Sequence, residues 1–197
     1  MMRRPAANVD VAAIDVRQAG GYLVGFSAGT GRNMHRAGAG KMDNVVMWLA
    51  TGLGTGLSPW ASGTVGSLLG LPLAWWVLGR TRRAQVAVTL VLLLAAVPVC
   101  HLAEQSLGAK DDGRIVLDEI VAFPVAVLGQ TAARQPWVMA SAFVVYRLFD
   151  ATKPPPIHLA ETVPGGAGIV LDDVLAALVS WLVVAGGLIL WRRRQAS

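Results

Sequence analysis

Three long stretches of the chain carry no charged residue, and each is apolar enough to form a helix. They cover residues 44–79, 84–100 and 174–191. No segment alternates apolar and polar positions over a useful length, so the pattern predicts helices and no sheet. A helix of 17 or 18 residues, the length of the second and third stretches, is about 25–27 Å long, close to the hydrocarbon thickness of a bilayer. We therefore predict an all-α fold, a compact multi-helix bundle with about three or more membrane-embedded helices.

The flanks of these stretches favour a membrane over a soluble core. Basic residues follow them at 80–83 and 192–194, and tryptophans lie within or near their ends, as interfacial anchors do. The alternative is that all three are buried helices of a soluble all-α domain. Two shorter apolar stretches, 120–133 and 136–149, are compatible with further spans, half-buried helices or bundle core.

Composition narrows the class of protein. Hydrophobic residues make up 54% of the 197 positions and charged residues only 15%, against roughly 25% in ordinary soluble domains, which excludes a disordered chain. The single cysteine, Cys100, excludes a disulfide scaffold and a cysteine-rich zinc site. A net charge of +5 is compatible with a nucleic-acid binder, but in so apolar a chain it favours the membrane, and we expect no nucleic-acid partner.

The positive charge is concentrated at the N-terminus. Residues 1–41 contain six basic and two acidic side chains, are rich in glycine and show no helical or strand period. We interpret 1–41 as a flexible basic leader and 42–197 as one helical membrane domain. That domain is nearly neutral, with eleven basic and ten acidic residues.

Acidic residues gather in a few places. Nine of the twelve fall between Glu104 and Asp173. Grouped carboxylates repel one another unless a cation or a basic partner joins them, and charges beside membrane helices are often functional. Mg²⁺, which prefers oxygen ligands, would suit such a group. The residues that form these groups are Asp111, Asp112, Asp118, Glu119, Asp150, Asp172 and Asp173.

Each group also has a plainer explanation. Asp172 and Asp173 would stabilise a helix N-terminus, and Arg147 and Asp150 have the spacing of a surface ion pair on one helix. The pair 118–119 is harder to dismiss, because apolar residues follow at once and one of two adjacent helical residues must face the bundle. The glycine- and hydroxyl-rich segment 51–67 could cradle phosphate with its backbone amides or simply allow close helix packing.

Taken in order, these segments resemble the phosphatidylglycerophosphatase A family. The likeness covers about 42–191 and rests on four ordered motifs. One difference is Ser62, where the family usually has proline before Gly-Thr. The motifs are 49–59 with 63–67, then 111–119 (DDGRIVLDE), 146–150 (YRLFD) with 153–157 (KPPPI), and 165–173 (GGAGIVLDD).

The resemblance implies a Mg²⁺-dependent phosphatase of the bacterial inner membrane, a multi-pass protein. Its substrate would be a phospholipid in the bilayer, phosphatidylglycerophosphate, and its product phosphatidylglycerol. The resemblance also implies a helical bundle with one central helix surrounded by the others. It leaves the oligomeric state open.

From the residues themselves we assign roles within that reaction. As metal ligands we predict Asp111, Asp118, Glu119, Asp172 and Asp173. As catalytic residues we predict Asp118, Glu119, Asp150 and Asp173. To bind the substrate phosphate we predict Arg147, Lys153, Thr64 and Ser67.

A competing hypothesis is a small membrane carrier or cation channel that uses the same carboxylates; a structural membrane adaptor is a third. Topology also stays open. The positive-inside rule places 80–83 and 192–194 in the cytoplasm, and full crossing of the two adjoining helices would then put the acidic motifs outside. We nevertheless expect a site that faces the cytoplasm, where the family's substrate is made.

Overall fold

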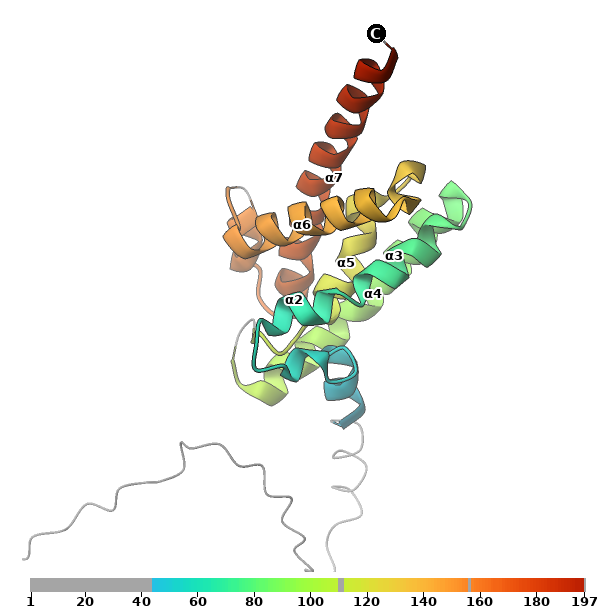
Figure 1. Cartoon of the computed structure of the whole chain (residues 1–197). Helices are drawn as coiled ribbons and strands as arrows, with labels where there is room; N and C mark the ends of the chain where they lie inside the picture. Colours follow the sequence, from blue (N-terminus) through green and yellow to red (C-terminus); the bar gives the residue numbers. More distant parts are fainter. Residues whose placement is uncertain (1–43, 110–111, 156, 197) are drawn as a thin grey trace, which may run out of the picture. The chain divides into compact units, whose positions relative to one another are not determined.

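The structure is a computed structural model that describes residues 44–109, 112–155 and 157–196, and all regular elements in these ranges are helical (Figure 1). The predicted all-α class is confirmed, whereas the predicted leader 1–41 lies outside the described residues. After a helical segment at 44–50, the elements are η1 (Thr55–Leu57), α2 (Ser62–Ser67), α3 (Gly70–Leu78), α4 (Arg82–Leu107), α5 (Leu117–Val127), η2 (Thr131–Arg134), α6 (Pro136–Thr152), η3 (Ile157–Thr162) and α7 (Gly166–Ala196).

Helix α5 is the centre of the bundle. It contacts α2, α3, α4, α6 and α7, and all its residues from Ile120 to Val127 are buried. A helix that is apolar on every side needs neighbours on every side. At its middle, Phe123 packs against Phe143 of α6, with ring centroids 5.5 Å apart. Beyond its end, Trp181 of α7 donates an indole N–H to the carbonyl of Leu128 at 2.8 Å, which ties α5 to α7.

Two helices of the described part, α4 and α7, are long and apolar enough to cross a membrane. Their 26 and 31 residues correspond to about 39 and 46 Å. Many of their apolar side chains are exposed, among them Leu94 at 63% and Leu182 at 64%. A core helix of a soluble protein would bury such residues, so lipid contact is the better account of this surface.

The first uncharged stretch, 44–79, does not form a long helix. Gly52 and Gly54 take positive φ values of 54° and 91°, a conformation that ends a helix, and the chain then turns again before α2. Where about three or more embedded helices were predicted, the described residues therefore contain two of spanning length, and 44–79 folds into shorter pieces. The stretches 120–133 and 136–149 become mainly the buried helix α5 and the helix α6.

Close packing explains part of the glycine-rich segment. A Cβ on Gly66 of α2 would lie 2.6 Å from the Cβ of Val116, and one on Gly56 would lie 2.3 Å from the carbonyl oxygen of Arg114. These distances leave no room for a side chain. The helix-packing explanation therefore holds for Gly56 and Gly66, which seat the segment against the start of α5.

The bundle has an acidic end and a basic end. Helices α4 and α7 run antiparallel, because Gly166 of α7 packs against the Val97 carbonyl of α4 while Arg82 of α4 lies beside Arg192 of α7. In Figure 1, α7 extends past the other helices toward the C-terminus. Its acidic pair lies in the second turn, beyond the first turn expected of residues that stabilise a helix N-terminus, and its arginines lie near the end. Nineteen residues separate Asp173 from Arg192, about 28 Å along the helix.

Candidate active site

The carboxylates and the phosphate-binding candidates meet where three helix ends come together. Helix α5 runs parallel to α7 and α6 runs in the opposite direction, so the first turn of α5, the last turns of α6 and the first turns of α7 lie close together. Each end brings one of the motifs found in the sequence. The side chains involved are Asp118, Glu119, Tyr146, Arg147, Asp150, Lys153, Asp172 and Asp173.

Arg147 joins two of the acidic groups. Its Nη1 lies 2.8 Å from Oε2 of Glu119 on α5 and donates a hydrogen bond to Asp150 one turn along α6. The side chains of Arg147, Glu119 and Asp150 are exposed by only 18%, 14% and 10% in these pairs. The local ion pair expected from the spacing is therefore present, and it is extended to a carboxylate from another helix.

The glycine motif reaches this cluster at Gly63. A Cβ there would lie 2.7 Å from Oε1 of Glu119 and 2.9 Å from Nη2 of Arg147. The backbone of α2 therefore lies directly against the ion pair. Its Ser67 is buried and donates to the Gly63 carbonyl at 2.7 Å, and its hydroxyl is also a hydrogen-bonding neighbour of the Glu119 carboxyl.

Lys153 and Asp172 form a second ion pair. The Nζ of Lys153 lies 2.6 Å from Oδ2 of Asp172, whose side chain is 5% exposed. Lys153 ends α6 in the left-handed region, with φ of 39°, a conformation that is costly for a residue with a Cβ. The ion pair, which connects the end of α6 to α7, is one contact that holds it there.

Tyr146 is a functional candidate that the sequence did not reveal. It is completely buried, and its hydroxyl donates to Oδ1 of Asp173 at 3.0 Å. The electrostatic neighbours of this hydroxyl also include Asp118, Glu119 and Asp150. In the sequence, the apolar residues around it are typical of a core tyrosine, so its contact with the carboxylates depends on the fold.

Glu119 has an unusual proton affinity. Burial raises its pKa from 4.5 to about 7, Arg147 partly opposes this, and the nearby Asp150 adds to the increase. Its Oε2 is buried and accepts no hydrogen bond of favourable geometry, although Arg147 is close. A further cation at this oxygen would stabilise the charged form.

The remaining predicted residues fall in three places. Asp118 is buried and accepts the backbone N–H of Glu119 at 2.9 Å. Thr64 lies on α2 with an exposed side chain. Asp111 lies outside the described residues. The structure thus brings together most of the predicted site, while the role of each residue stays a prediction.

The donor set suits Mg²⁺, although no ready-made cage is present. Within the described residues, no three carboxylate, histidine or cysteine side chains converge on one point. Mg²⁺ commonly uses one or two protein carboxylates and completes its shell with water and substrate phosphate. Here the carboxylate oxygens lie beside two basic side chains, and Oε2 of Glu119 accepts no hydrogen bond. This arrangement is compatible with that mode of Mg²⁺ binding.

Comparison with known proteins agrees with these motifs. Residues 48–187 match the model of the family described as phosphatidylglycerophosphatase A. The phosphatidylglycerophosphatase A of Escherichia coli K12 is 36% identical over 71% of this chain and 81% of its own length, and that of Haemophilus influenzae is 35% identical over 72% and 87%.

A third relative points to a different lipid. A Bacteroides thetaiotaomicron protein, named provisionally as a phosphatidylinositol-3-phosphatase, is 33% identical over 70% of this chain and 89% of its own length. No solved structure matches the chain. The family match covers well over half of the chain and includes all four motifs, and it sets this protein among hydrolases and not among carriers or channels. The chain belongs to the phosphatidylglycerophosphatase A family.

Proposed function

We propose that this protein is a Mg²⁺-dependent phosphatase that removes the terminal phosphate of phosphatidylglycerophosphate and releases phosphatidylglycerol. The observation that carries the proposal is the pairing of Arg147 and Lys153 with carboxylates from α5, α6 and α7. The two side chains would supply positive charge for a phosphate among acidic oxygens that would suit a metal. The names of the Escherichia coli and Haemophilus relatives support the choice of substrate.

Arg147 and Lys153 would bind the phosphate oxygens. Arginine offers a planar set of N–H donors and lysine a compact charge. Each now contacts a carboxylate, at 2.8 Å for Arg147 and Glu119 and 2.6 Å for Lys153 and Asp172. A bound phosphate would share these cations with the carboxylates, and the backbone of α2 at Gly63, which lies against Glu119 and Arg147, would border it.

The acidic residues would hold the metal and position the nucleophile. Asp118, Glu119, Asp172 and Asp173 would supply Mg²⁺ ligands, with Asp111 and Asp150 as further candidates. When bound, Mg²⁺ would neutralise phosphate oxygens and lower the pKa of a water molecule. In the reaction, water oxygen bonds to phosphorus, the bond from phosphorus to the glycerol oxygen breaks, and that oxygen takes up a proton.

Tyr146 would keep Asp173 in place through its 3.0 Å hydrogen bond.

Water is the nucleophile that we favour. A carboxylate nucleophile would instead form an acyl phosphate on the enzyme, which acid-quenched reactions with ³²P-labelled lipid would reveal as labelled protein.

The lipid would reach the site within the bilayer. Helices α4 and α7 would cross the inner membrane, and the shorter apolar helices α2 and α3 would lie embedded beside them, which makes the protein multi-pass. The site lies near the ends of α5, α6 and α7, so a head group at the membrane surface would meet Arg147 and Lys153 while its acyl chains stay in the lipid.

The test is Mg²⁺-dependent phosphate release from phosphatidylglycerophosphate by the full chain in detergent micelles. We expect loss of activity on chelation, and at least a 100-fold decrease in Asp118→Asn and Asp173→Asn. Asp112→Asn is the matched control, because Asp112 belongs to the same motif but pairs with Arg114 at 2.7 Å. Full activity in both site variants would refute the proposal. Faster release from phosphatidylinositol 3-phosphate would instead assign the substrate suggested by the Bacteroides relative.

A further inference from the structure

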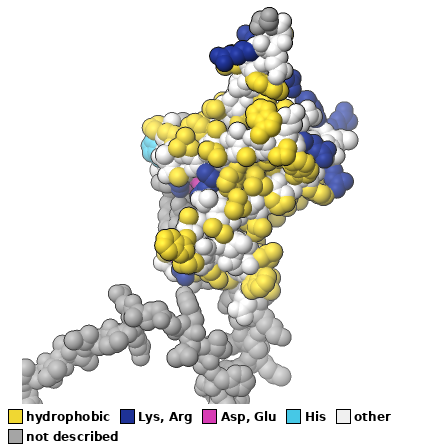
Figure 2. Space-filling model, in the orientation of Figure 1, with side chains coloured by type: hydrophobic (Ala, Val, Ile, Leu, Met, Phe, Trp, Pro, Cys, Tyr) yellow, Lys and Arg dark blue, Asp and Glu magenta, His cyan; other side chains and the backbone are white. Residues whose placement is uncertain are grey.

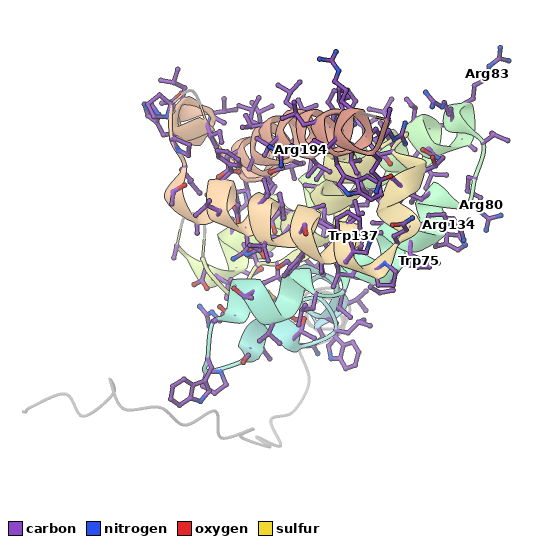
Figure 3. The ribbon with its side chains drawn as sticks, turned by 45° about the horizontal axis from the view of Figure 1, so that its top comes forward. Trp75, Arg80, Arg83, Arg134, Trp137 and Arg194 are labelled. Atoms are coloured by element: carbon purple, nitrogen blue, oxygen red, sulfur yellow. The ribbon has the colours of Figure 1, made fainter. Side chains whose placement is uncertain are left out.

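The basic end of the bundle holds a second concentration of charge. It carries seven arginines, while the segments 44–103, 120–149 and 174–197, from which it is built, contain no acidic residue. Figure 3 shows Arg80 and Arg134 near Trp75, with Arg83 farther out on the same side of the molecule and Arg194 apart from them. The seven are Arg80, Arg82, Arg83, Arg134, Arg192, Arg193 and Arg194.

A pocket of about 230 Å³ opens at this end. Its polar side is formed by Arg82 at the start of α4, Arg192 near the end of α7 and the loop residue Thr131. Nη1 of Arg82 would lie 3.9 Å from a Cβ on Gly129, so the guanidinium reaches over the turn after α5. Its apolar lining includes Leu188 and Ile189, which lie about one turn before Arg192 on α7.

The arginines around the pocket differ in what they contact. Arg80 lies over the ring of Trp76 at 4.4 Å and Arg134 over that of Trp75 at 5.8 Å. Among the described residues, neither Arg82 nor Arg192 forms an ion pair, and both side chains are exposed. Two cations that line one pocket repel each other, and an anion between them removes that repulsion.

The surroundings identify the kind of anion. Ile189 and Leu190 of α7 are 53% and 62% exposed. Trp137 and Trp191 stack edge to face at 5.6 Å beside them. Tryptophans next to exposed aliphatic residues and arginines are typical of the level where lipid head groups meet acyl chains. Figure 2 shows hydrophobic side chains over much of this face, with basic side chains toward its margin and at the end of α7.

We propose that this pocket binds the head group of an anionic phospholipid, with its phosphodiester between Arg82 and Arg192 and its acyl chains along Leu188 and Ile189. The site is separate from the catalytic one, because Arg192 lies about 28 Å along α7 from Asp173. It would anchor this end of the bundle in a leaflet rich in anionic lipid. The proposal does not depend on the reaction at the other end.

The experiment measures binding and no activity. The full chain in a neutral detergent is titrated with phosphatidylglycerol, and the dissociation constant is measured by native mass spectrometry. Phosphatidylcholine with the same acyl chains tests the need for net negative charge, and glycerol 3-phosphate tests whether a phosphate without acyl chains is enough. The same titration in Arg147→Gln removes a binding group of the catalytic site and so separates the two sites.

We expect Arg82→Gln with Arg192→Gln to weaken phosphatidylglycerol binding about 30-fold, since each arginine near a membrane surface contributes about a factor of five. The matched control is Arg83→Gln with Arg194→Gln, which removes the same charge outside the pocket and should change binding less than twofold. Arg192→Gln alone, at an exposed position, should weaken it about fivefold and covers the case in which the double variant does not fold.

Equal weakening in the pocket and control variants would overturn the proposal, because it would show attraction to net charge alone. Equal affinity for phosphatidylcholine would also overturn it, as would tight binding of glycerol 3-phosphate. Loss of binding in Arg147→Gln would assign the lipid to the catalytic site.

Discussion

Arg147→Gln tests whether the ion pairs of the site hold its helices together as well as bind substrate. The wild-type guanidinium lies between Glu119 of α5 and Asp150 of α6, 2.8 Å from the former. Glutamine keeps much of the length and removes the charge. Two mostly buried carboxylates then face each other without a cation.

The expected cost follows from that geometry. Removing one partner of a buried pair costs about 3–5 kcal/mol. Because the three side chains keep 10–18% of their surface exposed, we expect the lower limit, about 3 kcal/mol. In a domain of this size that lowers the midpoint of thermal unfolding by about 6–12 °C. Phosphate release should fall at least 100-fold, since about 2.7 kcal/mol of transition-state stabilisation is lost.

A second substitution separates the two effects. In Arg147→Gln with Glu119→Gln, one of the two unpaired carboxylates is gone and Asp150 alone remains, so part of the loss in the unfolding midpoint should be recovered while activity stays lost. Arg134→Gln is the control, because Arg134 lies over Trp75 at the other end of the bundle. The reasoning fails if Arg147→Gln unfolds at the wild-type temperature, or if the double variant is no more stable than the single one.

Two further predictions concern the site and its orientation. Tyr146→Phe removes the hydroxyl that donates to Asp173 at 3.0 Å, and leaving a buried polar atom without its partner costs about 1–3 kcal/mol. The value of kcat should fall about 10- to 100-fold with KM nearly unchanged. A lower thermal midpoint with normal kcat would make the tyrosine merely structural. In a Cys100→Ala background, Gly113→Cys and Gln195→Cys each introduce a single cysteine. A membrane-impermeant maleimide should label these two cysteines from opposite sides of the membrane. Labelling from the same side would contradict spanning by α4 and α7.

The long helices could be predicted because charges bound them. Helix α4 begins at Arg82 and Arg83, and α7 ends shortly after the arginines at 192–194. The apolar run that follows the first pair and the one that precedes the last three are both long enough to predict a helix. The same scarcity of charge made each acidic group conspicuous. Four motifs separated by up to a hundred residues were therefore enough to indicate the site. In so apolar a chain, charged residues that do not belong to such motifs are few.

The contacts within the site could not be predicted in the same way. Arg147 and Asp150 are three residues apart, so their pairing follows from helical spacing. The bond from Arg147 to Glu119 spans 28 residues, and that from Lys153 to Asp172 spans 19; both depend on how α5, α6 and α7 pack. The break of 44–79, by contrast, follows from a cluster of glycines and proline at 52–66 that marks a joint in the sequence, and two of those glycines adopt positive φ.

The separation of charge along α7 constrains how the enzyme meets its membrane. If the basic end lies in the cytoplasm, as the positive-inside rule requires, the carboxylates lie toward the opposite face, contrary to the expectation of a cytoplasmic site. Placing the site in the cytoplasm instead would put seven arginines on the outer face, on segments that contain no acidic residue. An anionic lipid between Arg82 and Arg192 would reduce the cost of either arrangement, because it supplies the missing counter-charge locally.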